Sequence, residues 1–225
     1  MCTNYAAARR DYLFRHYGVI PPDDPWRDEI YKDYAAPVIR RASAAAETRE
    51  ALLATFGMVP RKHIPPGVKV FDTMNARAES VGEKRSFSGA WKKLQLCLIP
   101  CAAFFEPNYE TGKAVRWRIG LANGVPFAIA GLWREWDEGD AGKAYSFTML
   151  TVNANDHPLM KRFHKPGDEK RSVVIVPPAD YDNWLASRST DEARSFLNLY
   201  PVEGMAAEPD PAPPRATPKP VRADP

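Results

Sequence analysis

The second residue of the chain is a cysteine, and its chemistry depends on the fate of the methionine before it. If Met1 is removed, Cys2 carries both a free amine and a thiol. Such a 1,2-aminothiol traps aldehydes, because the amine condenses to an imine and the neighbouring sulfur then closes a five-membered thiazolidine. Position alone favours a simpler interpretation, in which Cys2 is an incidental thiol at a disordered chain end.

Two further side chains could transfer protons. Glu106 follows two phenylalanines at the end of an apolar run, and a carboxyl group buried there would suit general acid–base catalysis. His164 lies among five basic side chains in KRFHKPGDEKR, and a histidine can exchange a proton near neutral pH. The simpler alternatives are a solvated turn carboxylate for Glu106 and a loop histidine without a role for His164.

The segment MNARAES could bind an anion. Asn75, Arg77 and Glu79 fall on one face if the segment is extended, because side chains alternate along a strand. An ordinary ion pair on a surface strand is the duller alternative. Lys165 and Arg171, near His164, could add contacts to phosphate groups.

The other two cysteines, Cys97 and Cys101, lie in the apolar stretch LQLCLIPCAAFFEP. Free cysteines in such surroundings usually behave as small buried hydrophobic residues. The four histidines show no paired spacing with the cysteines that would match a common zinc site. The sequence therefore predicts neither a metal nor a cofactor.

Composition favours one globular domain followed by a tail. The 225 residues are 44% hydrophobic and 26% charged, and the net charge of +3 permits a nucleic-acid partner without requiring one. An odd number of cysteines, with no long apolar run and no leader, predicts a cytosolic protein with reduced thiols and no membrane partner. Residues 205–225 hold seven of the 22 prolines, so we expect a domain over 1–204 and a disordered tail over 205–225.

These candidate residues need a framework, and the patterns favour an α+β fold around a mostly antiparallel sheet or barrel. Runs rich in β-branched and aromatic residues predict strands at 115–120, 125–136, 145–154 and 171–177. Capping and apolar spacing predict helices at 85–94, 179–187 and 190–200, and residues 5–18 could form another. Segment 36–60 is ambiguous, because its alanines favour helix while PVIR and TFGMVP are typical of strands.

Cys2, NARAES, CLIPCAAFFEP, FAIAGLWREW, TMLTVNAN and RFHKPGDEKRSVVIV follow one another in an order that closely resembles the SOS response-associated peptidase (SRAP) family. Members of that family process abasic sites in DNA, and the resemblance covers about residues 2 to 187. It implies that Cys2 becomes the mature N-terminus, after removal of Met1 that could be autocatalytic, and bonds to the ring-opened aldehyde of an abasic site in single-stranded DNA.

The resemblance also implies roles for the other candidates. Asn75 would help to hold the reactive centre, Glu106 would be the catalytic glutamate, and His164 the active-site histidine. Arg77 would bind a flanking phosphate, and Thr151 would line the site. The implied fold is a twisted, largely antiparallel, barrel-like sheet flanked by short helices, which resolves segment 36–60 toward strands. A cytoplasmic, nucleoid-associated monomer with possible lyase activity is expected.

Four departures from the family pattern limit the resemblance. Thr3 and Asn4 follow the cysteine where a glycine and an arginine are usual, and Pro107 replaces an aromatic residue. FGMVPRK carries Arg61 and Lys62 where an aromatic wedge is expected, so base stacking would be weaker and the electrostatic grip stronger. An insertion after His164 leaves Arg171, or alternatively Lys165, as the candidate phosphate contact.

Two other functions remain compatible with these residues. One is a thiol peptidase that uses Cys2 with His164 and Glu106 on added peptides. The other is a module that binds single-stranded nucleic acid without catalysis, which would show salt-dependent affinity for undamaged DNA and no covalent adduct.

Overall fold

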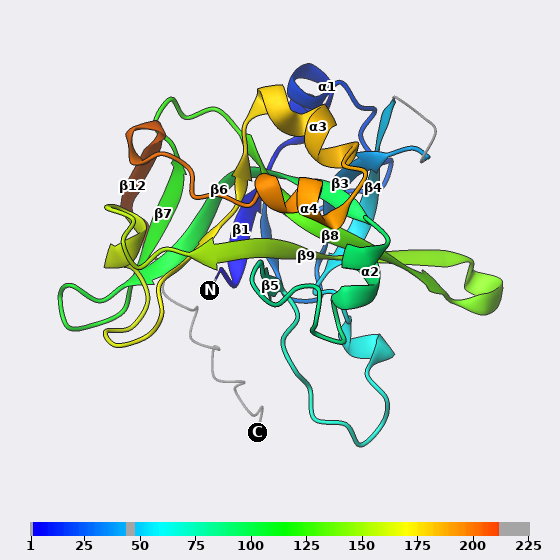
Figure 1. Ribbon diagram of the computed structural model, residues 1–225, viewed down its shortest axis with the longest axis horizontal. Helices are drawn as coiled ribbons and strands as arrows, with labels where there is room; N and C mark the ends of the chain where they lie inside the picture. The colour runs from blue at the N-terminus through cyan, green and yellow to red at the C-terminus, as the bar shows by residue number, and fades with distance from the viewer. Residues whose placement is uncertain (1, 44–47, 212–225) are drawn as a thin grey trace, which may run out of the picture.

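The computed structural model describes residues 2–43 and 48–211, and their fold is α+β, as the sequence predicts. A large, strongly curved sheet forms the body of the molecule, and the helices cover one side of it (Figure 1). The strands are β1 (Asn4–Ala7), β2 (Glu29–Tyr31), β3 (Ala35–Arg41), β4 (Arg49–Phe56), β5 (Asn75–Arg77), β6 (Leu96–Asn108), β7 (Val115–Leu121), β8 (Phe127–Asp137), β9 (Lys143–Asn153), β10 (Arg171–Val173), β11 (Ile175–Val176) and β12 (Met205–Pro209).

Five of these strands close on themselves. The order runs β8-β9-β4-β3-β6, and β6 pairs again with β8, from Leu96 opposite Leu132 to Cys101 opposite Phe127. All these pairings are antiparallel except β4–β9. Closure into a barrel leaves fewer exposed strand edges, and it confirms the barrel-like sheet that the family resemblance implies.

Closure brings three strands very close together at one glycine. A Cβ atom added to Gly131 of β8 would lie 2.7 Å from the Cδ1 of Ile99 and 2.8 Å from the Thr148 carbonyl oxygen. No larger residue fits without moving the backbone of β9.

The ambiguous segment 36–60 contains two strands, β3 and β4, paired from Ala35–Thr55 to Arg41–Arg49. This pairing buries Val38 and Ile39 completely. Burial of β-branched side chains therefore outweighs the helical propensity of the alanines. Ala44, Ala45 and Ala46 lie outside the described residues.

The barrel strands separate two apolar clusters, because their side chains alternate between two faces. On β6, Leu96 and Leu98 join a cluster that includes helix residues such as Trp91 and Trp184. The other cluster, here called the inner cluster, consists of buried residues that include Cys2, Tyr5, Phe56, Cys97, Ile99, Cys101, Ile129, Phe147 and Met149. Cys97 and Cys101 are thus buried free thiols, as the sequence predicts.

The helices are shorter than the sequence predicts. The segments 85–94, 179–187 and 190–200 each contain one. Segment 5–18 contains one in its second part, whereas its first residues belong to β1, which pairs with β2 and β6. The α-helices are α1 (Arg10–Tyr17), α2 (Ser88–Lys92), α3 (Tyr181–Leu185) and α4 (Thr190–Ser195), and the 3₁₀ helices are η1 (Arg61–His63), η2 (Gly139–Ala141), η3 (Met160–Arg162), η4 (Pro178–Asp180) and η5 (Val202–Gly204). In the described ranges no helix has the length and apolarity needed to cross a bilayer.

The expected boundary at residue 204 is wrong. Strand β12 pairs with β7 over five residues, from Met205 opposite Leu121 to Pro209 opposite Trp117, and Met205 is buried. Backbone hydrogen bonds to an existing strand edge order this segment despite its prolines. Residues 212–225, the rest of the expected tail, lie outside the described residues.

Candidate active site

Cys2 is a buried residue of the inner cluster rather than a loose terminal one. Its side chain is 1% exposed, and its Sγ lies 3.2 Å from the Asn4 carbonyl oxygen, to which the thiol donates. The Nδ2 of Asn75 donates to the Cys2 carbonyl oxygen over 2.7 Å. Two strands, β1 after Cys2 and β5 at Asn75, therefore fix the position of Cys2.

Asn75 is held by a short strand that inserts beside β9. Strand β5 runs parallel to β9, with Asn75 opposite Met149 and Arg77 opposite Thr151, and Ala76 between them is fully buried. The Oδ1 of Asn75 is buried and has no hydrogen-bond partner within the described residues. An unpartnered buried acceptor is costly, so this atom is suited to accept a hydrogen bond from a ligand or from a free N-terminal amine.

Glu106 and His164 form the second half of the site. Glu106 lies near the end of β6, opposite Trp117 of β7, and is 3% exposed. The Nε2 of His164 lies 3.2 Å from the Oε2 of Glu106, and the His164 side chain is 8% exposed. The Nδ1 of His164 is buried without a hydrogen-bond partner in the described part of the chain.

A strained turn presents His164. Its φ is 65°, in the left-handed region that non-glycine residues rarely adopt. The His164 N–H donates to the Pro107 carbonyl over 2.9 Å, which ties the turn to β6. The Nζ of Lys170 donates to the carbonyls of His164 and Lys165 over 3.2 and 2.7 Å. Sequence reasoning counted Lys170 only as one of several basic residues, because nothing in the local pattern reveals that it braces this turn.

The Cys2 thiol is electrostatically linked to Glu106. Burial raises the pKa of the Cys2 thiol well above its ordinary range, and the charge of the Glu106 carboxylate raises this pKa further. A weaker hydrogen bond with the Phe105 backbone acts in the opposite direction. The thiol is therefore protonated at neutral pH, and a base must remove its proton when the sulfur attacks.

Two of the basic residues expected to bind phosphate, Arg171 and Arg77, lie beside this site and are already held in ion pairs. Arg171 is 2% exposed, and its Nη1 and Nη2 bind both carboxylate oxygens of Glu79 over 2.9 Å each. Its Nη1 also binds Glu169 over 2.8 Å, and its Nη2 binds the Thr151 carbonyl over 2.7 Å. The Nη1 of Arg77 lies 2.7 Å from the second Glu169 oxygen. We call this group, Arg77, Glu79, Thr151, Glu169 and Arg171, the ion cluster.

The ion cluster changes what these residues can do. The terminal nitrogens of Arg171 are engaged by protein acceptors, and the buried Thr151 hydroxyl bonds Arg171 and the Ala76 carbonyl. These contacts describe a brace between β5, β9 and β10 rather than an open phosphate site. Arg77, whose side chain is half-exposed, is the member that a phosphate could reach in competition with Glu169.

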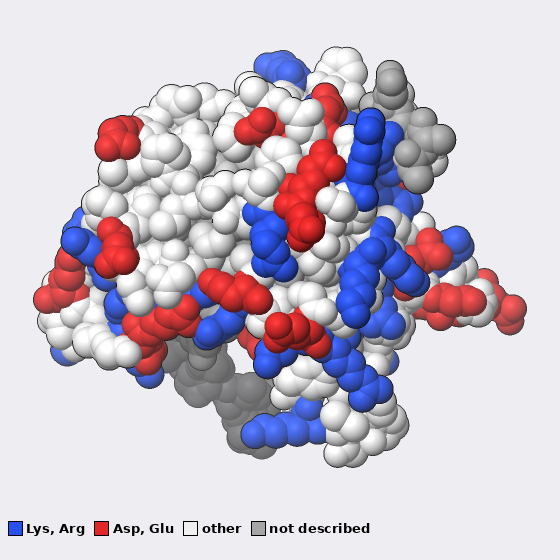
Figure 2. Space-filling view, viewed as in Figure 1, with Lys and Arg blue, Asp and Glu red and all other residues white. Residues whose placement is uncertain are grey.

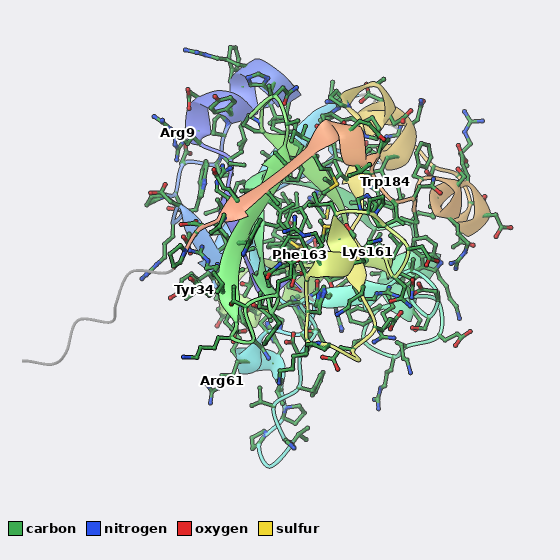
Figure 3. All side chains as sticks on the ribbon, turned by 90° about the vertical axis from the view of Figure 1, so that its left-hand side faces the viewer. Arg9, Tyr34, Arg61, Lys161, Phe163 and Trp184 are labelled. Carbon is green, nitrogen blue, oxygen red and sulfur yellow. The ribbon has the colours of Figure 1, made fainter. Side chains whose placement is uncertain are left out.

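The remaining predicted DNA contacts lie on the surface. Lys165 is exposed at the turn after His164. Arg61 and Lys62 are exposed on η1, and Figure 3 shows Arg61 at the edge of the molecule, away from Phe163, the neighbour of His164. Lys62 pairs with Glu138 of the β8–β9 hairpin. Within residues 2–43 and 48–211, no three His, Cys, Asp or Glu side chains group as metal ligands would.

Comparison with known proteins identifies relatives of this chain. A family model described as SOS response associated peptidase (SRAP) matches residues 1–210. The protein YoqW of Bacillus subtilis, named an abasic site processing protein, is 30% identical over 151 residues, which are 64% of this chain and 64% of YoqW. YobE of the same organism, with the same description, is 30% identical and is covered over 65% of its length. The match thus spans just under two thirds of these relatives.

Solved structures share the fold over almost the whole chain. A crystal structure of a Bordetella bronchiseptica protein superposes with a TM-score of 0.82 and 34% identity, over 94% of this chain and 100% of that one. A Bacteroides thetaiotaomicron protein gives a TM-score of 0.72 at 21% identity, over 92% of this chain and 90% of that one, a level that supports the fold alone.

Proposed function

The chain belongs to the SOS response-associated peptidase family, and on that premise we propose that it senses abasic sites in single-stranded DNA and crosslinks to them through Cys2. The observation that carries the proposal is the buried contact chain from Asn75 to Cys2 and from Glu106 to His164. The names of the Bacillus relatives, abasic site processing proteins, support the substrate.

The proposed reaction joins the aldehyde of a ring-opened abasic sugar to the 1,2-aminothiol of Cys2 after removal of Met1. The amine attacks the aldehyde carbon and one water leaves, which gives an imine. The sulfur then adds to the imine carbon while the imine nitrogen gains a proton and the thiol loses one, so the thiazolidine forms with no further loss. The whole sequence releases one water and needs no oxidant.

Glu106 is the group best placed to move these protons. Because burial raises the pKa of the Cys2 thiol, sulfur attack needs a base next to it, and the Glu106 carboxylate is the neighbour whose charge the thiol senses. The same carboxyl group can return the proton to the imine nitrogen. Asn75 would orient the amine through its Oδ1, which has no hydrogen-bond partner among the described residues.

His164 would act on the sugar. Its Nε2 lies against Glu106, and its buried Nδ1 lacks a protein partner in the described ranges. A protonated His164 can donate to the sugar ring oxygen as the ring opens. When the intermediate stays an imine, a base at this position could instead remove a sugar proton and release the 3′ phosphate, which would be lyase activity.

A crosslinking assay tests the proposal. The mature protein is incubated with single-stranded DNA that holds one abasic site, and adducts are counted on a denaturing gel. We expect an adduct with the natural chain and with Cys101→Ala, a matched control from the same inner cluster, and none with Cys2→Ala. An undiminished adduct in Cys2→Ala would refute the thiazolidine.

The buried thiol argues against a thiol peptidase that acts on added peptides. Such enzymes activate their cysteine by lowering the pKa of the thiol, whereas burial and Glu106 raise the pKa of Cys2. A single cleavage confined to the bond between Met1 and Cys2, without turnover of added peptides, is the expected result. Steady turnover of an added peptide that is lost in Cys2→Ala would favour the peptidase.

A further inference from the structure

A cavity of the described structure lies far from Cys2, at the other end of strand β6. Its volume is about 1010 Å³, and it is walled by the end of β3, the residues after α2, and α3 with the turn that follows. Leu96, at the start of β6, lines it, whereas Glu106 lies ten residues further along the same strand. Since a strand rises about 3.3 Å per residue, the two sites are about 30 Å apart along β6.

Positive charge dominates the wall of this cavity. Arg40, Lys93 and Arg188 line it, and Lys93 and Arg188 are exposed. The wall includes one acidic residue, Asp182. Its carboxylate accepts a hydrogen bond from the Nε of Arg49 over 2.6 Å. In Figure 2, Lys and Arg side chains gather on this face over β3, β4 and α2. The cavity therefore offers an anion several cations and little repulsion.

Contacts with neighbouring side chains hold the Arg40 side chain in one position in the cavity wall. Its side chain is 15% exposed, its Nε binds Glu50 over 2.7 Å, and its guanidinium lies 4.1 Å from the centre of the Trp133 ring. Its terminal nitrogens make no hydrogen bond to any described residue. A planar guanidinium that is fixed by stacking and by one ion pair, with its outer donors unused, is suited to bind a phosphate with little loss of entropy.

The turn at Leu94, which leads into β6, is also held in a fixed conformation. Leu94, in the wall, has a φ of 52°, a conformation in which glycine would be the usual choice. The turn closes with the Gln95 N–H donating to the Ala90 carbonyl over 2.9 Å. Leu94 packs against the apolar cluster that includes Trp91 and Trp184, and this packing holds Lys93 and Gln95 on the cavity wall.

We propose that this cavity binds the sugar–phosphate backbone of a nucleic-acid strand, as a second anchor remote from Cys2. Separate cations suit successive phosphates better than one small anion, and Trp133 and Leu94 supply the apolar surface that a sugar or base needs. The inference rests on the proposed function in one respect, which is that single-stranded DNA is the ligand. A strand that spans both sites would be held near both ends of β6.

Binding of undamaged single-stranded DNA tests the second anchor. The double variant Lys93→Glu, Arg188→Glu of the full chain is compared with Arg9→Glu, Arg15→Glu, which makes the same charge change on and next to α1. Figure 3 shows Arg9 at the edge of the molecule, well apart from Trp184 of α3. Affinity for oligonucleotides of about 20 and about 6 nucleotides is measured over a range of salt concentrations.

For the long oligonucleotide we expect the cavity variant to bind about tenfold more weakly, with a salt slope shallower by about 1.4 because two phosphate contacts are lost. The Arg9 and Arg15 variant should retain both affinity and slope. An unchanged slope in the cavity variant, or an equal loss in the control, would overturn the proposal. So would competition by a nucleoside monophosphate as strong as that of the oligonucleotide at equal phosphate concentration, because a small-nucleotide site would then be present.

Crosslinking of the short oligonucleotide with one abasic site separates this inference from the proposed function. With the abasic site at the centre of the short strand, the cavity variant should give the same adduct yield as the natural chain at saturating DNA, because neither half of that strand reaches from Cys2 to the cavity. If the natural chain itself forms no adduct, the proposed function fails while the binding result for undamaged DNA still decides the second anchor.

Discussion

Two groups of polar residues adjoin strand β5, and they differ in how far their buried hydrogen-bonding atoms are satisfied. In the ion cluster, both terminal nitrogens of Arg171 bind protein oxygens, and the Nε of Arg171 alone is buried without a partner among the described residues. At the Cys2 site, the Oδ1 of Asn75 and the Nδ1 of His164 are buried without partners among the described residues. Satisfied buried groups hold a fold together, whereas unpartnered ones cost free energy that a ligand can recover. We therefore assign a structural role to the ion cluster and a role in the reaction to the Cys2 site.

Glu106→Gln should produce the largest effect. The amide keeps the shape of the side chain but cannot take the thiol proton, so the rate of adduct formation should fall by about 10² to 10⁴ while the protein stays folded. Single-turnover kinetics on abasic single-stranded DNA measure this rate. Glu110→Gln, four residues further on and exposed beside Arg162, is the matched control and should keep the rate. Equal rates in both variants would remove Glu106 from the reaction.

Arg171→Met should lower the stability of the protein and leave the rate of adduct formation nearly unchanged, the reverse of Glu106→Gln. It removes the cation that holds Glu79, Glu169 and the Thr151 carbonyl. Because both carboxylates are partly exposed, the free energy of unfolding should fall by about 2 kcal/mol. Denaturant unfolding measures this loss. The adduct rate per folded molecule should stay within a few fold of the natural rate. A stable variant that has lost adduct formation would break the comparison, because Arg171 would then serve DNA rather than the fold.

Lys170→Met should have an intermediate effect on both quantities. The left-handed turn at His164 loses the cation that binds two of its carbonyls, and a misplaced His164 should slow adduct formation about tenfold, or about 1.4 kcal/mol. Lys170→Arg, which restores a cation, should recover part of the rate. A purely structural role would lower stability without changing the rate, and no recovery by arginine would count against the brace.

The reactivity of the Cys2 thiol gives the smallest but most specific test. Because burial and then Glu106 raise the pKa of this thiol, its thiolate fraction should keep rising with pH, and alkylation at Cys2 should show no plateau up to about pH 10, above the ordinary thiol value of about 8.5. Peptide mapping after iodoacetamide treatment measures the rate at each pH. Glu106→Gln removes a negative neighbour and should speed alkylation a few fold. A plateau near pH 8.5 would show an ordinary thiol.

The strand pattern was readable from the sequence, since β7, β8 and β9 coincide closely with runs of β-branched and aromatic residues. Finer features depend on tertiary pairing. The predicted strand at 171–177 is two strands, because β10 pairs with β9, β11 pairs with β8, and Val174 between them bonds Leu150 and Ala130. Only long-range contacts specify this switch, as they do for the strand at Met205–Pro209 that was expected to be disordered.

The candidate site was predicted through the family resemblance more than through local patterns. Position alone favoured an incidental Cys2, and nothing local shows that Asn75, Glu106 and His164 meet it. Contacts link Asn75 to Cys2 and Glu106 to His164, and the charge of Glu106 raises the pKa of the Cys2 thiol. The catalytic roles of these residues stay predictions. Sequence reasoning placed Arg171 among free phosphate contacts, because a basic residue near a site gives no sign that Glu79 and Glu169 will fold onto it.

The mass of the adduct tests the central claim most directly. The purified adduct between the full chain and a single-stranded oligonucleotide with one abasic site is weighed intact and then mapped by tandem mass spectrometry. The thiazolidine predicts the mass of the chain without Met1 plus the DNA less one water, with the bond at Cys2 and resistance to borohydride reduction. An adduct that retains Met1, or one that maps to a lysine, would contradict it.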